Sequence, residues 1–590
     1  MNYKGRTILA SVLMATVFAG LGVRLAFLHL KPSPETLVRI ESGRHLEEET
    51  RGPRGRILDR NGNILAVDIA ARHLCADPKF ILENGDIQQV CEAIAGVVPL
   101  SRSEIWTLLD QPERQYVRIQ KYMREKTLEQ LKEMKLKGVI LEETSMRNYP
   151  KGALGAHVIG FSNCEGVGGA GIEQRLNSYL QGTTGRKVSL KDGRRHEIYS
   201  RRTVDIEPQS GADIYLTIDQ QVQHFAEKAL DALVAKYQPQ GAWAIVQNVR
   251  SGEILAMASW PAYNPNRYGS APPEWMRNRT ISYGYEPGSV MKAMIIASAL
   301  DGGYVTPRDV FDCENGHWMY GGRALNDSHG EGLLSVADII KKSSNIGAAK
   351  IALQMGNEKT YQSLKSFGFG ARTGIDLPGE EGGILWTVKN WSKISITRLA
   401  MGHEINVTAL QMLSALSAIA NDGVRMRPYL VDKVVDAAGE TVFKTLPGEL
   451  GRPIRPETAK TMRRLLARVT QPGGTGTKAA VRGYPVAGKT GTAQKVRPKE
   501  EGGGYYDHKY FASFAGFLPV ENPAISIIVV VDDPQGAHYG GSVCGPAFRI
   551  IADQTVRYLR ISPQGFPTEY VSGLGPIVPE EKKSAEAGAL

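Results

Sequence analysis

The chain has 590 residues, of which 42% are hydrophobic and 22% are charged. These fractions are near the globular average and exclude a mainly disordered, collagen-like or fully membrane-embedded protein. The net charge of +10 is too dilute over this length to indicate nucleic-acid binding. The five cysteines are scattered without a CxxC pair, and their odd number leaves at least one without a partner in the chain.

An apolar segment near the N-terminus predicts a membrane anchor. As a helix, residues 7–30 are long enough, at about 1.5 Å per residue, to cross a hydrocarbon core of about 30 Å. Arg24 lies near the end of this segment, where its side chain can reach the headgroups. Lys4 and Arg6 precede the segment, so the positive-inside rule keeps the N-terminus cytoplasmic. The alternative is a cleaved signal peptide, but no small-x-small cleavage site follows the segment.

The segment after the anchor predicts a mixed α+β module. The pair Asn61-Gly62 lies between two short apolar runs, which is the pattern of a hairpin turn. Residues 85–137 show helical periodicity with many charges, and glycine and proline punctuate residues 150–171. Residues 31–205 contain no paired-carboxylate signature.

From residue 211 onward the pattern changes to apolar strands and helices. Strands near both ends of this region, with helices between them, favour one antiparallel sheet that is built from chain-distant strands and packed with helices. The polar tail from Pro579 to Leu590 is expected to be disordered. The predicted strands are 214–219, 242–247, 253–258, 511–517 and 525–531, and the predicted helices are 220–236, one after residue 288, 333–368, 408–421 and 545–560.

The first candidate chemical motif is Ser-x-x-Lys at 289–292. Pro287 and Gly288 break the chain before an apolar helix, so Ser289 lies at the helix N-terminus, where free N–H groups favour negative charge. Lys292 shares a face with Ser289. A partly desolvated lysine can lose its proton and accept that of the hydroxyl, which would make Ser289 a nucleophile. Taken alone, the tetrapeptide is more often an N-cap serine followed by a surface lysine.

The second motif is Ser343-Ser344-Asn345, which the pattern places on a helix. Ser343 is suited to relaying a proton, and Asn345 to binding a substrate amide. In isolation, the same three residues describe an ordinary polar turn of a helix.

The third motif is Lys489-Thr490-Gly491-Thr492 on a predicted strand. The lysine and the hydroxyl groups can hold a substrate carboxylate, and Gly491 lets another backbone approach closely. The N–H of Thr492 can join that of Ser289 in an oxyanion hole, where removing one donor typically costs ~10²–10³ in rate. By itself this motif is more often a plain edge-strand lysine.

The order and spacing of the three motifs carry more information than each alone. Ser343 follows Ser289 by 54 residues, and Lys489 follows Ser343 by 146. S-x-x-K, S-D-N and K-T-G in this order are the signature of penicillin-binding proteins and class A β-lactamases. The second motif here is S-S-N, which fits transpeptidases better than class A β-lactamases.

From about residue 7 to 560 the chain resembles the class B penicillin-binding proteins, most closely the division-specific peptidoglycan transpeptidases. The resemblance includes non-catalytic motifs at 54–62, 147–150, 168–173 and 374–380. No glycosyltransferase motif precedes residue 211, which disfavours the bifunctional class A proteins.

The resemblance implies an α+β fold class. We expect a single N-terminal transmembrane helix, an elongated α/β pedestal domain, and a penicillin-binding transpeptidase domain whose antiparallel sheet is flanked by helices. The expected boundaries are 1–6 for a cytoplasmic tail, 7–30 for the anchor, 31–205 for the pedestal of the dimerisation type, 206–562 for the transpeptidase domain and 563–590 for a C-terminal tail.

The resemblance also implies the activity, which is that of a serine-type D-Ala–D-Ala transpeptidase in septal cell-wall synthesis. Ser289 would attack the penultimate D-Ala of a stem pentapeptide, with Lys292 as base and Ser343 passing the proton to the leaving D-Ala. A neighbouring stem's amine then takes the acyl group, and β-lactams would acylate the same serine. The implied catalytic residues are Ser289, Lys292, Ser343, Asn345 and Lys489, and the implied substrate-binding residues are Thr490, Gly491 and Thr492.

The resemblance implies no cofactor and no nucleic acid. The expected partners are stem pentapeptides, lipid-linked nascent glycan, a SEDS-type glycosyltransferase and other division proteins. The expected location is the cytoplasmic membrane at the division septum, with the catalytic domain extracytoplasmic. The alternatives are an elongation- or sporulation-specific transpeptidase, a non-catalytic β-lactam sensor or scaffold, and a β-lactamase.

Four side chains between the first two motifs have the chemistry of zinc ligands. They are Cys313, His317, Asp327 and His329. The competing interpretation is a loop with ordinary polar residues, and we expect no metal.

Overall fold

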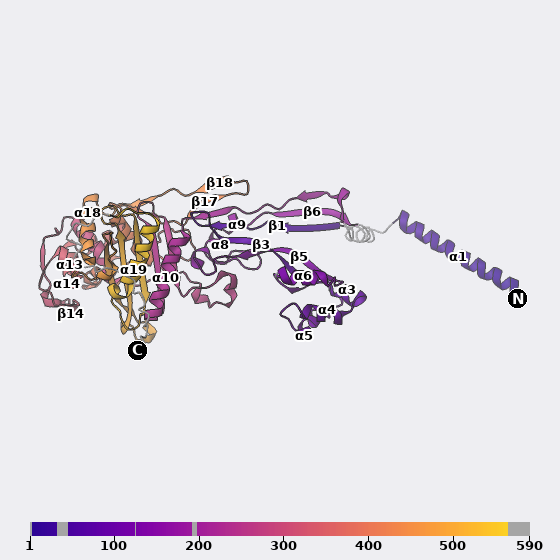
Figure 1. Ribbon diagram of the computed structural model, residues 1–590, viewed down its shortest axis with the longest axis horizontal. Coiled ribbons are helices and arrows are strands. Elements are labelled where there is room, and N and C mark those ends of the chain that lie inside the picture. Colours follow the sequence, from indigo (N-terminus) through magenta and orange to yellow (C-terminus); the bar gives the residue numbers. More distant parts are fainter. Residues whose placement is uncertain (1–2, 32–44, 124, 192–196, 564–590) are drawn as a thin grey trace, which may run out of the picture. The chain divides into compact units, whose positions relative to one another are not determined.

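The computed structural model describes residues 3–31, 45–123, 125–191 and 197–563 (Figure 1). The chain divides into two compact units. The first contains the residues up to Pro53 together with Gly182–Gly211, and the second contains Arg54–Gln181 and the residues from Ala212 onward. The predicted disordered tail at 579–590 lies outside the described residues.

The first unit consists of a long helix and a small sheet. Helix α1 (Tyr3–Leu30) starts four residues before the predicted anchor, and no residue in it is buried. Among the described residues it is the one helix long and apolar enough to cross a membrane. In the sheet, β6 (Thr184–Lys191) pairs antiparallel with β1 (His45–Arg51), β7 (Glu197–Ile198) and β8 (Val204–Ile206).

The second unit begins with the predicted hairpin. Strands β2 (Ile57–Leu58) and β3 (Ile64–Ala76) pair antiparallel, and Gly62 takes a φ of 83° in the turn between them. Strand β3 also pairs with β4 and β5. The other elements of this part are α3 (Pro78–Asn84), α4 (Ile87–Ala95), α5 (Arg102–Leu109), β4 (Val117–Gln120), α6 (Glu125–Glu133), β5 (Val139–Asn148), α7 (Ala156–Ile159), α8 (Gly171–Arg175) and α9 (Asn177–Leu180).

The helical pattern predicted over 85–137 is interrupted by strand β4. Val117 and Ile119 of this strand are buried and alternate with exposed or half-buried residues. Burial of these two side chains favours a strand here, although the residues around it have helical periodicity. Helix α4 starts where Asp86 accepts two backbone N–H groups, and α5 starts at a capping box of Ser101 and Glu104.

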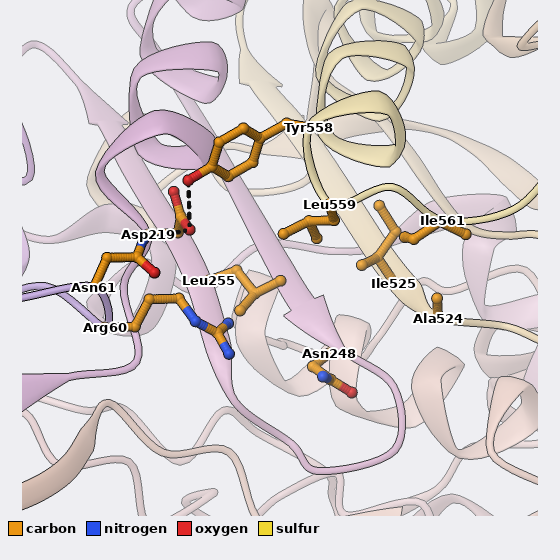
Figure 2. A pocket seen from close by; sticks show the side chains of 10 residues that line it. All are labelled: Arg60, Asn61, Asp219, Asn248, Leu255, Ala524, Ile525, Tyr558, Leu559 and Ile561. Carbon is orange, nitrogen blue, oxygen red and sulfur yellow. Dashed lines mark hydrogen bonds between the residues drawn. The ribbon is translucent and has the colours of Figure 1, made fainter.

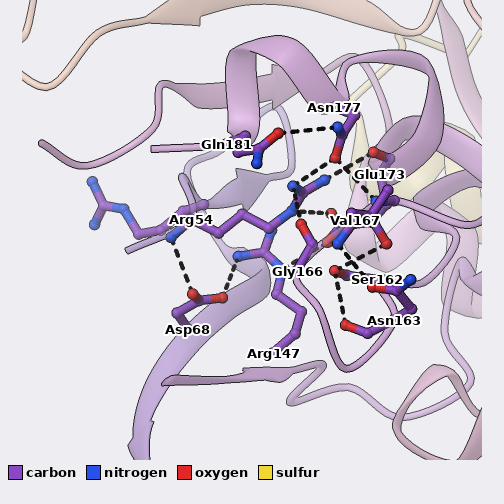
Figure 3. A network of polar contacts seen from close by, with 12 residues as sticks. Arg54, Asp68, Arg147, Ser162, Asn163, Gly166, Val167, Glu173, Asn177 and Gln181 are labelled. Atoms are coloured by element: carbon purple, nitrogen blue, oxygen red, sulfur yellow. Dashed lines mark hydrogen bonds and ion pairs between the residues drawn. The ribbon is translucent and has the colours of Figure 1, made fainter. Parts of the chain in front are cut away.

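A buried network of charged side chains joins several elements of this part (Figure 3). Arg54, just before β2, and Arg147 of β5 each place Nε 2.6 Å from a different carboxylate oxygen of Glu173 in α8. Arg147 also pairs with Asp68 of β3 at 3.1 Å. Glu173 is completely buried, and two guanidinium groups compensate the cost of desolvating its charge. Arg54, Arg147 and Glu173, which belong to the non-catalytic motifs, therefore hold together the segment before β2, strand β5 and helix α8.

The main sheet of the second unit is antiparallel, with its described strands in the order β11-β10-β22-β21-β20. Strand β10 comes early in this region, yet Gly241 lies opposite Asp532 of β22. The predicted sheet of chain-distant strands is confirmed, and β20 lies at its edge. The strand predicted at 214–219 does not belong to it, because Ile214 and Tyr215 pair with Ile57 and Leu58 of β2 in another sheet. The bounds are β10 (Gly241–Asn248), β11 (Ile254–Trp260), β20 (Ala487–Val496), β21 (Tyr505–Leu518) and β22 (Ile525–Asp532).

Helices cover both faces of this sheet. Successive side chains of a strand point to opposite faces, and in β10 both sets are apolar and buried. Ala242 and Ala244 of β10 pack in an apolar cluster with α10 and α19, which lie beside each other in Figure 1. Trp243 and Ile245 belong to the cluster on the other face, with α12 and α17. These helices are α10 (Gln220–Tyr237), α12 (Lys292–Asp301), α17 (Ala409–Ala420) and α19 (Gly540–Tyr558).

The predicted helix over 333–368 is wrong in its continuity. Three helices occupy this range, and they are separated by Ser343 and Gly356, whose φ angles are 66° and 76°. The last helix starts at Gly540, five residues earlier than predicted. The bounds of the remaining elements are β9 (Asp213–Leu216), α11 (Arg279–Ser282), β12 (Val310–Asp312), β13 (His317–Tyr320), β14 (Arg323–Asn326), β15 (Leu333–Ser335), α13 (Val336–Lys342), α14 (Asn345–Met355), α15 (Asn357–Ser366), α16 (Ser395–Ala400), β16 (Arg425–Met426), β17 (Val431–Val435), β18 (Thr441–Lys444), β19 (Glu449–Gly451) and α18 (Pro456–Ala467).

Candidate active site

Ser289 lies in a single 3₁₀ turn, η4 (Gly288–Met291), which leads directly into α12. Gly288 has a φ of 56°, and a Cβ built there would lie 2.6 Å from the carbonyl oxygen of Thr492. Only glycine allows the turn to approach strand β20 this closely. The turn therefore holds the Ser289 hydroxyl, which is half-buried, beside the third motif.

Lys292 is completely buried one turn after the serine. Its Nζ lies 2.9 Å from Ser289 Oγ, 2.6 Å from the Ser343 carbonyl oxygen and 2.6 Å from Asn345 Oδ1. Burial lowers the pKa of Lys292 to about 7, and the charge of Asp327 opposes this shift. Near neutral pH this lysine exchanges between its charged and neutral forms.

The second motif occupies a break between two helices, and not a continuous helix as predicted. Ser343 ends α13 in the left-handed conformation, and Ser344 caps α14 by accepting the N–H of Gly347 at 3.0 Å. This break turns the Ser343 hydroxyl and the Asn345 amide toward Lys292. The other end of the Asn345 amide donates to the carbonyl oxygen of Asn326 at 2.7 Å.

Asp327 supports this break, and the sequence analysis missed that role. Its carboxylate accepts the Ser344 hydroxyl at 2.5 Å, the Ile346 N–H at 3.1 Å and the Asn345 N–H. Because a loop, strand β15 and helix α13 separate the residue from the motif, no local pattern marks it. A carboxylate at the N-terminus of α14 also interacts favourably with the helix dipole.

The third motif lies on the edge strand β20, where Lys489 is completely buried. Its Nζ lies 2.7 Å from Ser343 Oγ, and 3.3 and 3.4 Å from the carbonyl oxygen and Oγ1 of Thr490. Burial, followed by the charge of Lys292, lowers the pKa of Lys489. A Cβ on Gly491 would lie 2.7 Å from the Pro287 carbonyl oxygen, so this glycine lets β20 pack against the serine turn.

Two further hydroxyl groups of the third motif have partners on neighbouring elements. Thr490 Oγ1 lies 2.9 Å from Thr475 Oγ1, and Thr492 Oγ1 accepts the N–H of Gly540 at 3.2 Å. All eight residues predicted to act on substrate therefore meet at one place. Ser343 Oγ is within 3.3 Å of both lysine Nζ atoms, which links the three motifs into one polar chain.

The four side chains considered as zinc ligands have other partners or lie apart. Asp327 holds the second motif, and Cys313 accepts a hydrogen bond from the Ser344 hydroxyl at 3.3 Å. His317 Nδ1 lies 2.7 Å from Asn326 Oδ1. In the part of the chain that the structure describes, no three His, Cys, Asp or Glu side chains gather as a metal site.

A cavity of about 430 Å³ lies elsewhere in the second unit (Figure 2). Arg60 and Asn61 from the hairpin turn and Tyr558 from the end of α19 line it, and the Tyr558 hydroxyl donates to Asp219 at 3.3 Å. No residue of the three motifs lines it, so the cavity is separate from the serine site.

Comparisons with known proteins show which family the chain resembles. Residues 242–553 match the family model described as Penicillin binding protein transpeptidase domain, and residues 49–216 match Penicillin-binding Protein dimerisation domain. Among curated proteins, the chain is 33% identical to "Probable peptidoglycan D,D-transpeptidase PenA" of Neisseria meningitidis, over 95% of this chain and 94% of the relative. It is also 33% identical to "Peptidoglycan D,D-transpeptidase FtsI" of Escherichia coli, over 94% and 92%.

A solved structure supports the same assignment. Penicillin binding protein 3 of Mycobacterium tuberculosis, complexed with aztreonam, superposes with a TM-score of 0.68 at 27% identity, covering 88% of this chain and 98% of that one. The two family models together cover most of the chain, and both relatives align over almost their full length. The chain therefore belongs to the class B penicillin-binding proteins and is a peptidoglycan D,D-transpeptidase.

Proposed function

We propose that this enzyme crosslinks stem peptides through an acyl-enzyme on Ser289 during septal cell-wall synthesis. The observation that carries the mechanism is the 2.9 Å distance between Lys292 Nζ and Ser289 Oγ, with the lysine completely buried. With a pKa of about 7, a large fraction of Lys292 is neutral at neutral pH. The neutral amine accepts the hydroxyl proton as Ser289 attacks the penultimate D-Ala carbonyl.

Ser343 would carry that proton onward. Its Oγ lies 3.3 Å from Lys292 Nζ and 2.7 Å from Lys489 Nζ. The proton taken by Lys292 passes through Ser343 to the nitrogen of the leaving D-Ala, which departs as the amine. The driving force is the exchange of one amide bond for another, so the reaction needs no nucleotide.

Lys489 is suited to bind the terminal carboxylate of the donor peptide. Among the described residues it makes no ion pair with a carboxylate, and a second buried lysine, Lys292, lies next to Ser343 on the other side. A buried cation without a counter-ion is costly, and a substrate carboxylate removes that cost. Thr490 and Thr492 add hydroxyl groups to the same site.

The backbone N–H groups of Ser289 and Thr492 would form the oxyanion hole. The support is the close packing of Gly288 on the Thr492 backbone, which brings the serine turn and β20 together. Two such donors stabilise the charge that develops on the carbonyl oxygen in the transition state.

The septal role, the membrane location and the partners belong to the same proposal. It is supported by the FtsI relative and by the exposed apolar helix α1, with Lys4 and Arg6 at its start. We assign residues 1–6 to the cytoplasm, 7–30 to the membrane, 31–205 to the pedestal, 206–562 to the catalytic domain and 563–590 to a tail. The partners would be lipid-linked glycan, a SEDS-type glycosyltransferase and other division proteins.

Labelling with fluorescent penicillin tests the acyl-enzyme. The full-length protein in detergent should form one covalent adduct, which mass spectrometry places on the peptide containing Ser289. Ser289→Ala should form none. Equal labelling of the wild type and the variant would refute the mechanism, and steady antibiotic turnover would reveal a β-lactamase.

Fluorescence imaging of the tagged full-length protein tests the septal role. Recruitment to midcell at constriction is expected. A distribution along the side wall, or restricted to sporulating cells, would instead assign the same chemistry to elongation or sporulation.

A further inference from the structure

Glu286, three residues before the proposed nucleophile, has a carboxyl oxygen without a partner. Its Oε1 accepts the N–H of Glu404 at 2.9 Å and the hydroxyl of Tyr505 at 3.2 Å. Its Oε2 is buried and has no hydrogen-bond partner among the described residues. Buried polar atoms are nearly always paired, so this oxygen marks a place where a donor from outside the chain is expected.

The groups around Glu286 favour a cation as that donor. Burial, assisted by the charge of Glu404, raises the pKa of Glu286 to about 7, against the opposing effects of the two hydrogen bonds and of Arg398. The ring of Tyr505 packs edge-on against His403 at 5.6 Å, and burial lowers the pKa of His403 to about 4. His403 is therefore neutral, and an ammonium group would compensate the carboxylate.

Glu286 lies toward the end of β20 to which the donor peptide would extend. The proposed carboxylate contacts start at Lys489, and the carbonyl to be attacked lies further along the strand, beside Thr492. The preceding stem residues then continue in the same direction, toward Val496. Val496 pairs with Tyr505, the residue that donates to Glu286. Because β20 is an edge strand, an extended peptide can add to it.

The distances available to the chain agree with this placement. Glu286 is three positions before Ser289, so their Cα atoms are at most about 11 Å apart. The third stem residue immediately precedes the D-Ala that acylates Ser289. A lysine-type side chain on it ends in an ammonium on a flexible stem of four carbons, long enough to reach the Glu286 carboxyl group.

We propose that Glu286 is a specificity-determining residue that binds the side-chain ammonium of a diamino acid at the third position of the donor stem. The inference rests on the proposed function, because it takes Ser289 as the acylated residue. A consequence is preference for donors that are not yet crosslinked. An amine already in a crosslink is a neutral amide and leaves the Glu286 carboxylate without its counter-ion.

Two donor thioesters test this inference with the full-length protein in detergent. Both are acyl-D-Ala-thioglycolates; one carries L-lysine and the other Nε-acetyl-L-lysine before the D-Ala. The rate of acylation of Ser289 should favour the lysine donor about 10- to 100-fold in the wild type, the size expected of a charge-assisted hydrogen bond. Glu286→Gln should bring this ratio near one, whereas the matched variant Glu404→Gln should keep it.

The pH dependence of the same ratio provides a second measurement. Comparing two donors cancels the titration of Lys292, which acts on both. The advantage of the lysine donor should fall as the pH is lowered from 8 to 5, because protonation of Glu286 removes the anion that attracts the ammonium.

The outcomes separate this inference from the proposed function. Failure of benzylpenicillin to form an adduct on Ser289 in the wild type overturns the proposed function. A normal adduct with equal wild-type acylation rates for the two donors overturns the assignment of Glu286 alone. The same holds if Glu286→Gln lowers the acylation rate equally for both donors, or if the loss of rate depends on the charge of the amine that accepts the acyl group. If Glu286→Gln binds no penicillin, Glu286→Asp replaces it and should show a reduced preference.

Discussion

The carboxylate of Asp327 accepts the backbone N–H of Asn345 at the point where α14 begins. The same carboxylate accepts the N–H of Ile346. The loop that carries Asp327, which is distant from Ser289 in sequence, therefore fixes the start of this helix. The direction of the Asn345 side chain, whose Oδ1 lies 2.6 Å from Lys292 Nζ, depends on this contact.

Replacing Asp327 by Asn should weaken the site without removing any group that would contact substrate. The substitution removes a charged acceptor of two backbone N–H groups, which costs about 1–3 kcal/mol in unfolding free energy. We expect benzylpenicillin acylation to slow by about 10- to 100-fold as Asn345 loses its position. Stopped-flow acylation and urea denaturation measure the two effects.

The control for this variant is Asp338→Asn, at the N-terminus of the neighbouring helix α13. It alters a carboxylate that accepts the hydroxyl of the N-cap Ser335 and pairs with Arg468. Among the described residues it makes no hydrogen bond to Lys292, so acylation should stay within about twofold. Wild-type acylation by Asp327→Asn would contradict the role given to Asp327.

The rate of penicillin acylation should rise with pH and level off above about pH 7. The base must be neutral to accept the serine proton, and burial lowers the pKa of Lys292 to about 7 from an ordinary lysine value of 10.5. Below pH 7 the rate should fall about tenfold per unit, since the neutral fraction of Lys292 shrinks by that factor. A midpoint near pH 10 would contradict the lowered pKa of Lys292.

Gly491→Ala should abolish most of the acylation while leaving the protein folded. The new Cβ would lie 2.7 Å from the Pro287 carbonyl oxygen and closer still to Ser513 Oγ. Pro287 cannot move away without moving Ser289, and a displacement of about 1 Å at a reacting group can cost about 100-fold in rate. Gly448→Ala, which would meet nothing within 4 Å, is the control and should react as the wild type does.

Arg147→Ala should destabilise the second unit by about 3–5 kcal/mol, because it leaves the buried Glu173 carboxylate without one of its two guanidinium partners. Denaturation by urea, followed by circular dichroism, measures the loss. Arg102→Ala breaks an ion pair with Glu92 in which both side chains are about half exposed, and it should cost no more than about 1 kcal/mol. Equal effects of the two variants would show that burial of the Glu173 network is energetically unimportant.

The sequence was sufficient to predict the main sheet because its strands follow simple patterns. Residues 242–247 and 253–258 are apolar runs around a Ser-Gly turn, and the structure pairs them as β10 and β11. It was also sufficient to select the residues that meet at the serine site. Ser289, Ser343 and Lys489 are far apart in the chain, yet Lys292 and Lys489 both contact the Ser343 hydroxyl.

The sequence was not sufficient to predict the structure where tertiary contacts determine the backbone conformation. The apolar periodicity of Ile339 and Ile340 continues through Ile346 and Ile351, so nothing local marks the break at Ser343. The energetic cost of the left-handed conformation of Ser343 is offset by its contacts with two lysines from other elements.

Glu286 was missed for a related reason. The side chain that orients it, Tyr505, comes 219 residues later in the chain. A glutamate before a proline carries no local signal, and only the folded chain places its carboxyl group against the tyrosine hydroxyl.

The pairing of β10 with β22 has a consequence for biosynthesis. The strand at 241–248 remains without this neighbour until the ribosome has made residue 532, about 290 residues later. Such long-range pairing is slow, and it leaves unpaired strand edges on the nascent chain meanwhile. A polypeptide that ends before Lys489 lacks the third motif, so it would be inert towards antibiotics as well as towards cell wall.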